Sequence, residues 1–306
     1  MQNTPSRLID YGTVVFLTLV WGLAWPVTVI GLRSCDPLVI ASSRCIIGGI
    51  GLFLWRARST TKERFDARTL GMIFIAATCW VGIPMALTAW ALQYITGGLG
   101  SVLQSTIPFF VALFAYFMLH ESRLSTVKIV GLIIGFIGII VLFSDDPFQV
   151  ANWLTIAGGS AILFSSITIG FAQVFSRRFF KGNDRIGFNM YVLLFSGLEI
   201  LPFCFVGGNP RVVVSTDLIL VLLYLGIVAS AVPFALYFEL FQRIDIVVLS
   251  MIAYVIPVVA VVSGIVWLGE RMTPADIAGS ALVLFGVVLT TQYHAVKSKL
   301  SSRSIL

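Results

Sequence analysis

The chain carries at residues 82–121 the stretch GIPMALTAWALQYITGGLGSVLQSTIPFFVALFAYFMLHE, and at residues 231–270 the stretch AVPFALYFELFQRIDIVVLSMIAYVIPVVAVVSGIVWLGE. Aligned without a gap at an offset of 149 residues, the two stretches share ten identical positions. Chance similarity between apolar stretches produces Leu–Leu and Ile–Ile pairs, whereas several of these matches are proline or polar. They pair Pro84 with Pro233, Gln93 with Gln242, Ser101 with Ser250, Pro108 with Pro257, and Glu121 with Glu270. An internal duplication is therefore predicted.

The composition predicts that lipid surrounds this duplicated chain. Hydrophobic residues make up 58% of the 306 positions and charged residues 11%, against about 25% charged in a soluble domain. The mean hydropathy is +0.99. So few charges do not cover a water-facing surface of this size, and an integral membrane protein is predicted.

Ten continuously apolar segments come near the roughly 20 residues that a membrane-spanning helix needs. Continuous runs of this length exclude barrel strands, which alternate apolar and polar residues. We therefore predict an all-α membrane protein with ten transmembrane helices, arranged as two inverted five-helix repeats. The predicted spans are 12–32, 38–55, 70–92, 97–119, 127–144, 153–176, 187–206, 217–241, 246–268 and 274–293.

The Lys and Arg residues predict the orientation, because cytoplasmic loops are enriched in them. With a cytoplasmic amino terminus, sixteen lie on the inside and three on the outside, while Arg44 falls within the second span. Both termini are thus predicted to be cytoplasmic. This placement explains the net charge of +6 without a nucleic-acid partner.

The domain organisation follows from the odd number of helices in each half, which makes the second half enter the membrane from the opposite side. We predict one repeat at residues 1–145, a second at 150–293 and a basic cytoplasmic tail at 294–306. Inverted repeats of this kind recur in secondary transporters, whose sites lie near mid-membrane between the repeats.

Motifs in both halves resemble those of the drug/metabolite transporter superfamily, specifically its EamA-type family. They are Leu19–Trp25 near the start, and a Ser–Pro–Glu pattern that closes each half. The pattern comprises Ser101, Pro108 and Glu121, then Ser250, Pro257 and Glu270, each followed by a glycine-spaced helix with Gly131, Gly135 and Gly138, then Gly279 and Gly286. The resemblance implies the ten-helix fold and the transport of small organic metabolites such as amino acids, commonly outward. His120 departs from the repeat, since Gly269 occupies the matching position.

Polar and aromatic side chains inside the spans are the candidates for a substrate pathway, because such groups are expensive in lipid. Helix packing and aromatic interfacial belts are the alternative explanations. Pro108 and Pro257 occupy matching positions of the two halves, and proline can bend a helix, so both are candidate hinges. The pathway candidates are Trp21, Trp25, Trp90, Ser101, Gln104, Ser105, Ser165, Tyr237, Glu239, Ser250 and Tyr254, with Trp80 as a further aromatic wall.

Glu239, Arg44 and Glu199 are charged residues within predicted spans. Glu239 is a candidate proton or cation site, with pairing near the membrane interface as the alternative. Arg44 would hold an anionic group of the cargo or make a structural contact, and Glu199 is interpreted as structural. Glu121 and Glu270 are interpreted as helix-capping groups, with gating as the alternative.

Taken together, the residues predict a secondary transporter that works by alternating access. The predicted cargo is an amino acid or related small metabolite, moved outward across a cell (inner) membrane; a translocator of lysolipids or drug-like amphipaths is the alternative. An intramembrane enzyme is disfavoured because the sequence has no His-Glu-x-x-His motif or nucleophile–base pattern. No cofactor or metal is predicted, since the four cysteines show no ligand spacing. The sequence leaves both monomer and homodimer open.

Overall fold

A computed structural model describes residues 4–58, 62–95, 97–119, 126–142, 153–180, 182–206, 208–241, 243–268 and 274–303. Within these residues the chain is helical, and the sole strand-like feature is an isolated bridge between Cys35 and Val212. Glu121 and Glu270, interpreted above as capping groups, lie outside the described residues.

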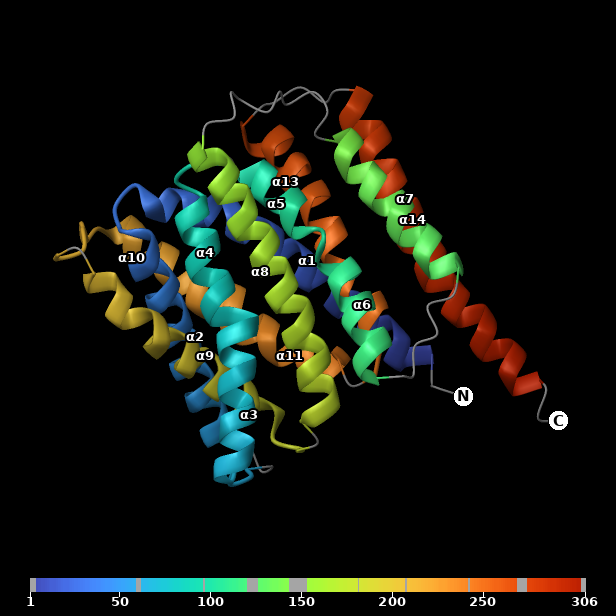
Figure 1. Ribbon diagram of the computed structural model, residues 1–306, viewed down its shortest axis with the longest axis horizontal. Helices are drawn as coiled ribbons and strands as arrows, with labels where there is room; N and C mark the ends of the chain where they lie inside the picture. Colours follow the sequence, from blue (N-terminus) through green and yellow to red (C-terminus); the bar gives the residue numbers. More distant parts are fainter. Residues whose placement is uncertain are drawn as a thin grey trace.

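The first half of the chain contains long helices interrupted by short irregular segments (Figure 1). Its elements are α1 (Thr4–Leu32), α2 (Pro37–Ala57), α3 (Ala67–Ala77), the π-helical η1 (Thr78–Gly82), α4 (Ile83–Ala91), α5 (Gly97–Gln104), α6 (Ile107–Leu119) and α7 (Thr126–Leu142).

The second half repeats this order. Its elements are α8 (Trp153–Phe179), α9 (Arg185–Ile200), the 3-10 helix η2 (Leu201–Phe205), α10 (Thr216–Leu223), the π-helical η3 (Tyr224–Ala231), α11 (Val232–Phe241), α12 (Ile246–Ser250), α13 (Ile252–Leu268) and α14 (Pro274–Arg303).

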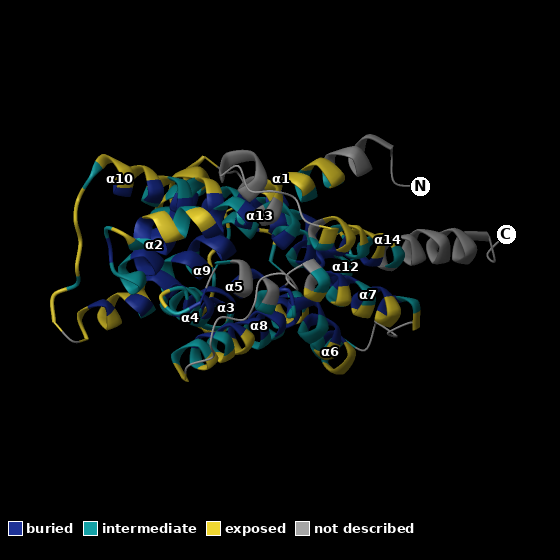
Figure 2. Cartoon of the chain, turned by 90° about the horizontal axis from the view of Figure 1, so that it is seen from above, coloured by how far each residue is buried: buried dark blue, intermediate teal, exposed yellow. Residues whose placement is uncertain are grey.

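Six of the described helical segments are long and apolar enough to cross a membrane, so the chain is a multi-pass membrane protein. They are Asp10–Leu32, Pro37–Ala57, Ala67–Ala91, Trp153–Phe179, Arg185–Phe205 and Thr216–Phe241. Four shorter apolar helices accompany them, at Ile107–Leu119, Thr126–Gly138, Ile246–Val259 and Ile277–Leu289. Many large apolar side chains on the outer faces of peripheral helices such as α6, α7 and α10 are exposed (Figure 2), as expected of surfaces that face lipid.

Two of the long helices contain a π-helical segment directly before a proline. Pro84 follows η1, and Pro233 follows η3. Proline has no N–H, and its ring clashes with the carbonyl four residues earlier, so a regular α-helical turn is disfavoured there. The wider π turn accommodates that clash. It leaves the carbonyls of Trp80 and Ala229 without their α-helical donors.

Small residues allow α2 and α9 to pack closely. A Cβ placed on Gly49 would lie 2.6 Å from the side chain of Leu194, and one on Gly197 would lie 2.6 Å from that of Ile46. Ser42 Oγ donates a hydrogen bond of 2.8 Å to the carbonyl of Gly197. Small-residue contacts of this kind are typical of helix pairs in membranes.

The final helices of the two halves, α7 and α14, lie side by side at one edge of the molecule (Figure 1). The described part of α1 begins, and that of α14 ends, at the same side of the molecule (Figure 1). The other helices pack around a core that includes Leu17, Ile73, Val111 and Tyr254.

Candidate ligand-binding cavity

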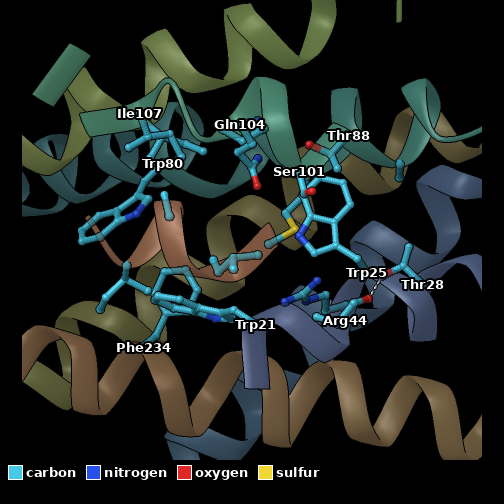
Figure 3. A pocket seen from close by; sticks show the side chains of 18 of the residues that line it. Trp21, Trp25, Thr28, Arg44, Trp80, Thr88, Ser101, Gln104, Ile107 and Phe234 are labelled. Carbon is cyan, nitrogen blue, oxygen red and sulfur yellow. Dashed lines mark hydrogen bonds between the residues drawn. The ribbon is translucent and has the colours of Figure 1, made fainter. Parts of the chain in front are cut away.

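A cavity of about 180 Å³ lies between helices of both halves. Its walls come from α1, α2, η1, α4, α5, α6, α8, α11, α12 and α13. Five aromatic side chains dominate the walls: Trp21, Trp25, Trp80, Phe234 and Tyr237. Figure 3 shows Trp21, Trp25, Trp80 and Phe234 around the opening. An aromatic wall of this size suits an apolar or aromatic group.

Polar side chains interrupt the aromatic wall. Among the residues described around the cavity, Arg44 is the only one that carries a charge. The neutral polar side chains in the wall are Thr28, Thr88, Ser101, Gln104, Gln173 and Ser250. Figure 3 shows Gln104, Ser101, Thr88 and Arg44 around the same space. A few polar groups in an apolar wall are the usual means by which a binding site orients its ligand.

Pro233 explains why Arg44 and Trp21 meet at one corner of this cavity. The carbonyl of Ala229 lies four residues before Pro233 and has lost its α-helical donor. Two side chains supply hydrogen bonds instead: Trp21 Nε1 donates to it at 3.2 Å and Arg44 Nη2 at 3.0 Å. Ser230 Oγ accepts a further bond of 2.7 Å from Arg44 Nε. The irregular helix therefore holds the guanidinium in the cavity wall.

Three buried polar atoms in the wall have no hydrogen-bond partner within the described part of the chain. They are Thr88 Oγ1, Gln173 Oε1 and Tyr237 OH. Thr88 and Tyr237 occupy equivalent positions of the two repeats, since they differ by the offset of 149 residues. Buried polar groups normally find a partner, so these three atoms are suited to bind a ligand.

Six of the eleven pathway candidates line the cavity: Trp21, Trp25, Ser101, Gln104, Tyr237 and Ser250. Trp80, the further aromatic candidate, lines it as well. The structure therefore brings together side chains from both halves that the duplication relates.

The structure places three candidates outside the cavity wall, each with a hydrogen bond to a backbone carbonyl. Ser105 lies in the interruption between α5 and α6, where its Oγ donates to the carbonyl of Ala253 at 2.9 Å. Tyr254 lies on α13, where Ala253 and Ile256 line the cavity, and its own OH donates to the carbonyl of Leu132 at 3.0 Å. Ser165 is buried and donates within its own helix, to the carbonyl of Ala161 at 2.9 Å.

The other two candidates lie near the ends of their helices. The ring of Trp90 packs at a tilt of 59° against that of Tyr94, with ring centroids 5.0 Å apart. Glu239 forms ion pairs with Arg185 and Arg243, and its side chain is 46% exposed. These contacts match the interfacial pairing that was the alternative interpretation of Glu239.

The candidate hinges differ in their surroundings. Pro108 is the second residue of α6, directly after the interruption at residues 105–106, whereas Pro257 lies inside the continuous helix α13. Pro257 leaves the carbonyl of Ala253 without its α-helical donor. Ser105 of the first half supplies that donor.

The sequence analysis did not include Thr28, Thr88, Gln173 or Phe234 among the pathway candidates. The duplication carried a signal for Thr88, because its partner Tyr237 was already a candidate. The prolines could have predicted the hydrogen bonds at Arg44. Each proline leaves the carbonyl four residues before it without its helical N–H donor, so that another helix has to supply one. For Gln173 the sequence holds no such signal, since its direction depends on the rotation of α8.

Glu199 lies on α9 and accepts a hydrogen bond of 2.8 Å from Thr78 Oγ1, at the start of η1. It does not line the cavity. This contact agrees with the structural interpretation of Glu199.

Comparison with known proteins identifies relatives over nearly the whole chain. The model of a family described as the EamA-like transporter family matches residues 10–144 and 156–292. The uncharacterized transporter YoaV of Bacillus subtilis is 26% identical over 280 residues, covering 91% of this chain and 95% of YoaV. The uncharacterized inner membrane transporter YedA of Escherichia coli K12 is 27% identical over 286 residues, covering 92% of this chain and 90% of YedA.

One solved crystal structure has the same fold. It superposes with a TM-score of 0.75 at 19% sequence identity, covering 95% of this chain and 98% of the other. At that identity the similarity concerns the fold alone.

Proposed function

Since the chain belongs to the EamA-like transporter family, we propose that it moves an amino acid or a related small organic metabolite out of the cytoplasm by alternating access. Its relatives are transporters and not enzymes. The observation that carries the proposal is the cavity of about 180 Å³, with its aromatic wall and its few polar groups, between the two halves of the chain.

The proposed architecture is ten spans in two inverted repeats, at residues 1–145 and 150–293. The six long helices and the four shorter apolar ones are the ten spans. Equivalent features in both halves support this arrangement. Residues 78–82 are π-helical, and so are residues 227–231 at the offset of 149. Gly138 approaches Gly279, and Gly286 approaches Gly131, which is the reciprocal contact that a twofold relation requires.

Ion pairs support a conformation closed at the proposed cytoplasmic end. Arg56 with Asp184, Lys128 with Asp245, and the chain from Asp10 through Arg243 and Glu239 to Arg185 all lie at that end. At the opposite end the described ion pairs comprise Arg211 with Asp36. The lining residues of α2 come from its first turns after Pro37, far from Arg56. We propose that the cavity opens toward the outer side in this state.

Stacked aromatic rings would form the floor of the cavity in that state. Trp80 contacts Phe241 with ring centroids 5.8 Å apart, and Phe241 stacks on Phe238 at 5.1 Å. Phe238 in turn stacks on Phe188 of α9 at 4.7 Å. This stack lies between the cavity and the ion pairs, so opening the cytoplasmic end requires the rings to separate.

The experiment that tests the proposed function is flux into proteoliposomes of the purified protein, with radiolabelled L-phenylalanine, L-leucine, putrescine, glucose and a lysophospholipid. We expect saturable flux of the amino acids above that of empty liposomes. Flux of the lysophospholipid alone would replace the proposal with translocation of amphipaths. Flux of none of the five would contradict the proposed cargo.

The hinge proposal predicts a separation between transport and binding. In the Pro108→Ala, Pro257→Ala double variant, the N–H regained at residue 257 can donate to the carbonyl of Ala253, and alanine at residue 108 lets the interruption between α5 and α6 become helical, so both helices stiffen. We expect the transport rate to fall about tenfold while the Kd of the cargo changes less than about twofold. Flux and equilibrium binding to the same preparation check this. Equal losses in both would contradict the hinge role.

Proton coupling through Glu239 remains a hypothesis with its own test. Because Glu239 is ion-paired outside the cavity, we expect Glu239→Gln to leave the shape of the pH dependence of flux unchanged. Flux measured from pH 5.5 to 8.5 in both proteins checks this. A flattened profile in the variant would instead establish Glu239 as the coupling group.

The proposed location is a cell membrane with both termini in the cytoplasm. YedA is an inner membrane transporter by name, and the bias of Lys and Arg supports this orientation. Both the monomer and the homodimer remain hypotheses for the assembly.

A further inference from the structure

The cavity contains a buried positive charge whose described partners are neutral. Arg44 is 8% exposed and lies within the span Pro37–Ala57. Its hydrogen bonds go to Ser230 Oγ and to the carbonyl of Ala229. Within the described residues no carboxylate lies at ion-pair distance from it. A charge at this depth is costly unless an anion compensates it.

We propose that the cavity recognises its cargo by a carboxylate group, which the guanidinium of Arg44 binds, while the rest of the cargo lies against the aromatic wall. This inference rests on the proposed function and names the substrate class of the same cavity.

The geometry of Arg44 suits a carboxylate. Guanidinium has five N–H donors in a planar fork. Its two described bonds use Nε and Nη2, so Nη1 takes part in neither. The two bonds fix the plane of the fork against η3, and Trp21 binds the same carbonyl of Ala229 beside it. A fork held in this way loses little freedom when it binds an anion.

The charge of the wall argues for a carboxylate over a phosphate ester. A phosphate monoester carries close to two negative charges at neutral pH and is usually bound by several cationic groups. The described wall supplies one cation. A carboxylate with one negative charge balances it.

The remaining space and polar atoms specify the rest of the cargo. A cavity of about 150 Å³ accommodates one benzene ring, so about 180 Å³ suits one ring or branched chain with a short polar head. Gln173 Oε1 and Tyr237 OH have no hydrogen-bond partner within the described residues, and both oxygens are able to accept a hydrogen bond from an ammonium or hydroxyl group on the cargo. The inference requires a carboxylate on the cargo. Whether the cargo also carries an amino group is tested separately by the probes below.

The test compares three probes that share one body: L-phenylalanine, 3-phenylpropionate, which lacks the amino group, and L-phenylalaninamide, which lacks the carboxylate. Binding is measured by the change in tryptophan fluorescence of the detergent-purified protein, since three tryptophans line the cavity. We expect the amide to bind at least tenfold more weakly than L-phenylalanine. If 3-phenylpropionate binds as tightly as L-phenylalanine, the cargo is an organic acid. If it binds more weakly than L-phenylalanine, the cargo is an amino acid. Both outcomes are consistent with recognition of the carboxylate.

Variants of Arg44 then test the residue itself. Arg44→Gln should remove the preference for L-phenylalanine over its amide, and Arg44→Lys should keep part of it. Ser230→Ala, which removes the partner of Arg44 Nε, should reduce the preference several-fold in a protein that keeps its buried charge. Arg211→Gln removes an exposed arginine at the same end of α2 and should leave the preference unchanged.

The outcomes distinguish this inference from the proposed function. Equal binding of the amide and the acid, or an unchanged preference in Arg44→Gln, would overturn the role of Arg44 even where proteoliposomes show flux. Selective binding of carboxylates without flux would support the role of Arg44 in recognising the carboxylate and would overturn the transport proposal. No binding of any of the three probes would contradict both.

Discussion

Asp184→Ala is expected to lower the free energy of unfolding by about 3 kcal/mol, which is the lower end of the cost of breaking a buried ion pair. The side chain of Asp184 is 1% exposed. Its Oδ2 accepts hydrogen bonds of 2.6 Å from Arg56 Nε and 3.1 Å from the backbone N–H of Glu63, and Oδ1 accepts one of 2.7 Å from that of Gly187. The variant leaves all three donors unpaired.

The lower end of the range applies because Arg56 retains other contacts. Its side chain is 18% exposed, and Nη2 also donates to the carbonyl of Glu63 at 2.7 Å. Solvent and that carbonyl therefore compensate part of the lost pair. The pair nevertheless joins the end of α2 to the start of α9, so its loss should also loosen the contact between the two halves.

Chemical unfolding in detergent micelles, followed by circular dichroism, measures this effect. Asp66→Ala is the matched control: Asp66 caps α3 by accepting a bond of 3.0 Å from Thr69 N–H at an exposed position, and its loss should lower the free energy of unfolding less than the loss of Asp184. The double variant Arg56→Gln, Asp184→Asn should cost less than the sum of its two single variants. A cost for Asp184→Ala no larger than that of the control would contradict the importance of the pair.

Much of the fold followed from the sequence because apolar length and the repeat offset do not depend on side-chain packing. The span predicted at 38–55 corresponds to α2 at Pro37–Ala57, and that predicted at 187–206 to Arg185–Phe205. The matched prolines indicated where the helices would be irregular. They did not specify the kind of irregularity, since π turns precede Pro84 and Pro233 whereas a break in the helix precedes Pro108.

The site was harder to predict, because it depends on how each helix is rotated. Ser101 and Ser250 were expected to meet at a common space, and both line the cavity. Tyr254 was assigned to the same face as Ser250 by helical spacing, yet Ile252, Ala253 and Ile256 line the cavity and Tyr254 does not. Two residues one turn apart can lie on either side of the edge of a cavity wall, and sequence spacing does not specify on which side each lies.

Gly286→Ala is expected to destabilise the protein by about 3 kcal/mol, at the upper end of the cost of overpacking. A Cβ on Gly286 would lie 2.5 Å from the backbone nitrogen of Gly135 and 2.6 Å from the carbonyl oxygen of Gly131. Backbone atoms cannot turn away as a side chain can, so α7 and α14 would have to separate. The matched control is Gly71→Ala, where a Cβ meets nothing within 4 Å and helix propensity favours alanine by up to about 1 kcal/mol.

The twofold relation makes a second, sharper prediction at this crossing. Past one deletion the offset between the halves becomes 148 residues, which makes Gly138 the repeat partner of Gly286. A Cβ on Gly138 would lie 2.6 Å from the backbone nitrogen of Val283 and 2.9 Å from the carbonyl oxygen of Gly279. Because the two contacts are reciprocal, Gly138→Ala should lower the thermal unfolding temperature by about as much as Gly286→Ala, while Gly71→Ala should not lower it. A large loss in one variant beside a small loss in the other would show that the two halves do not contribute equally here. It would then be evidence against an inverted repeat that extends to its last pair of helices.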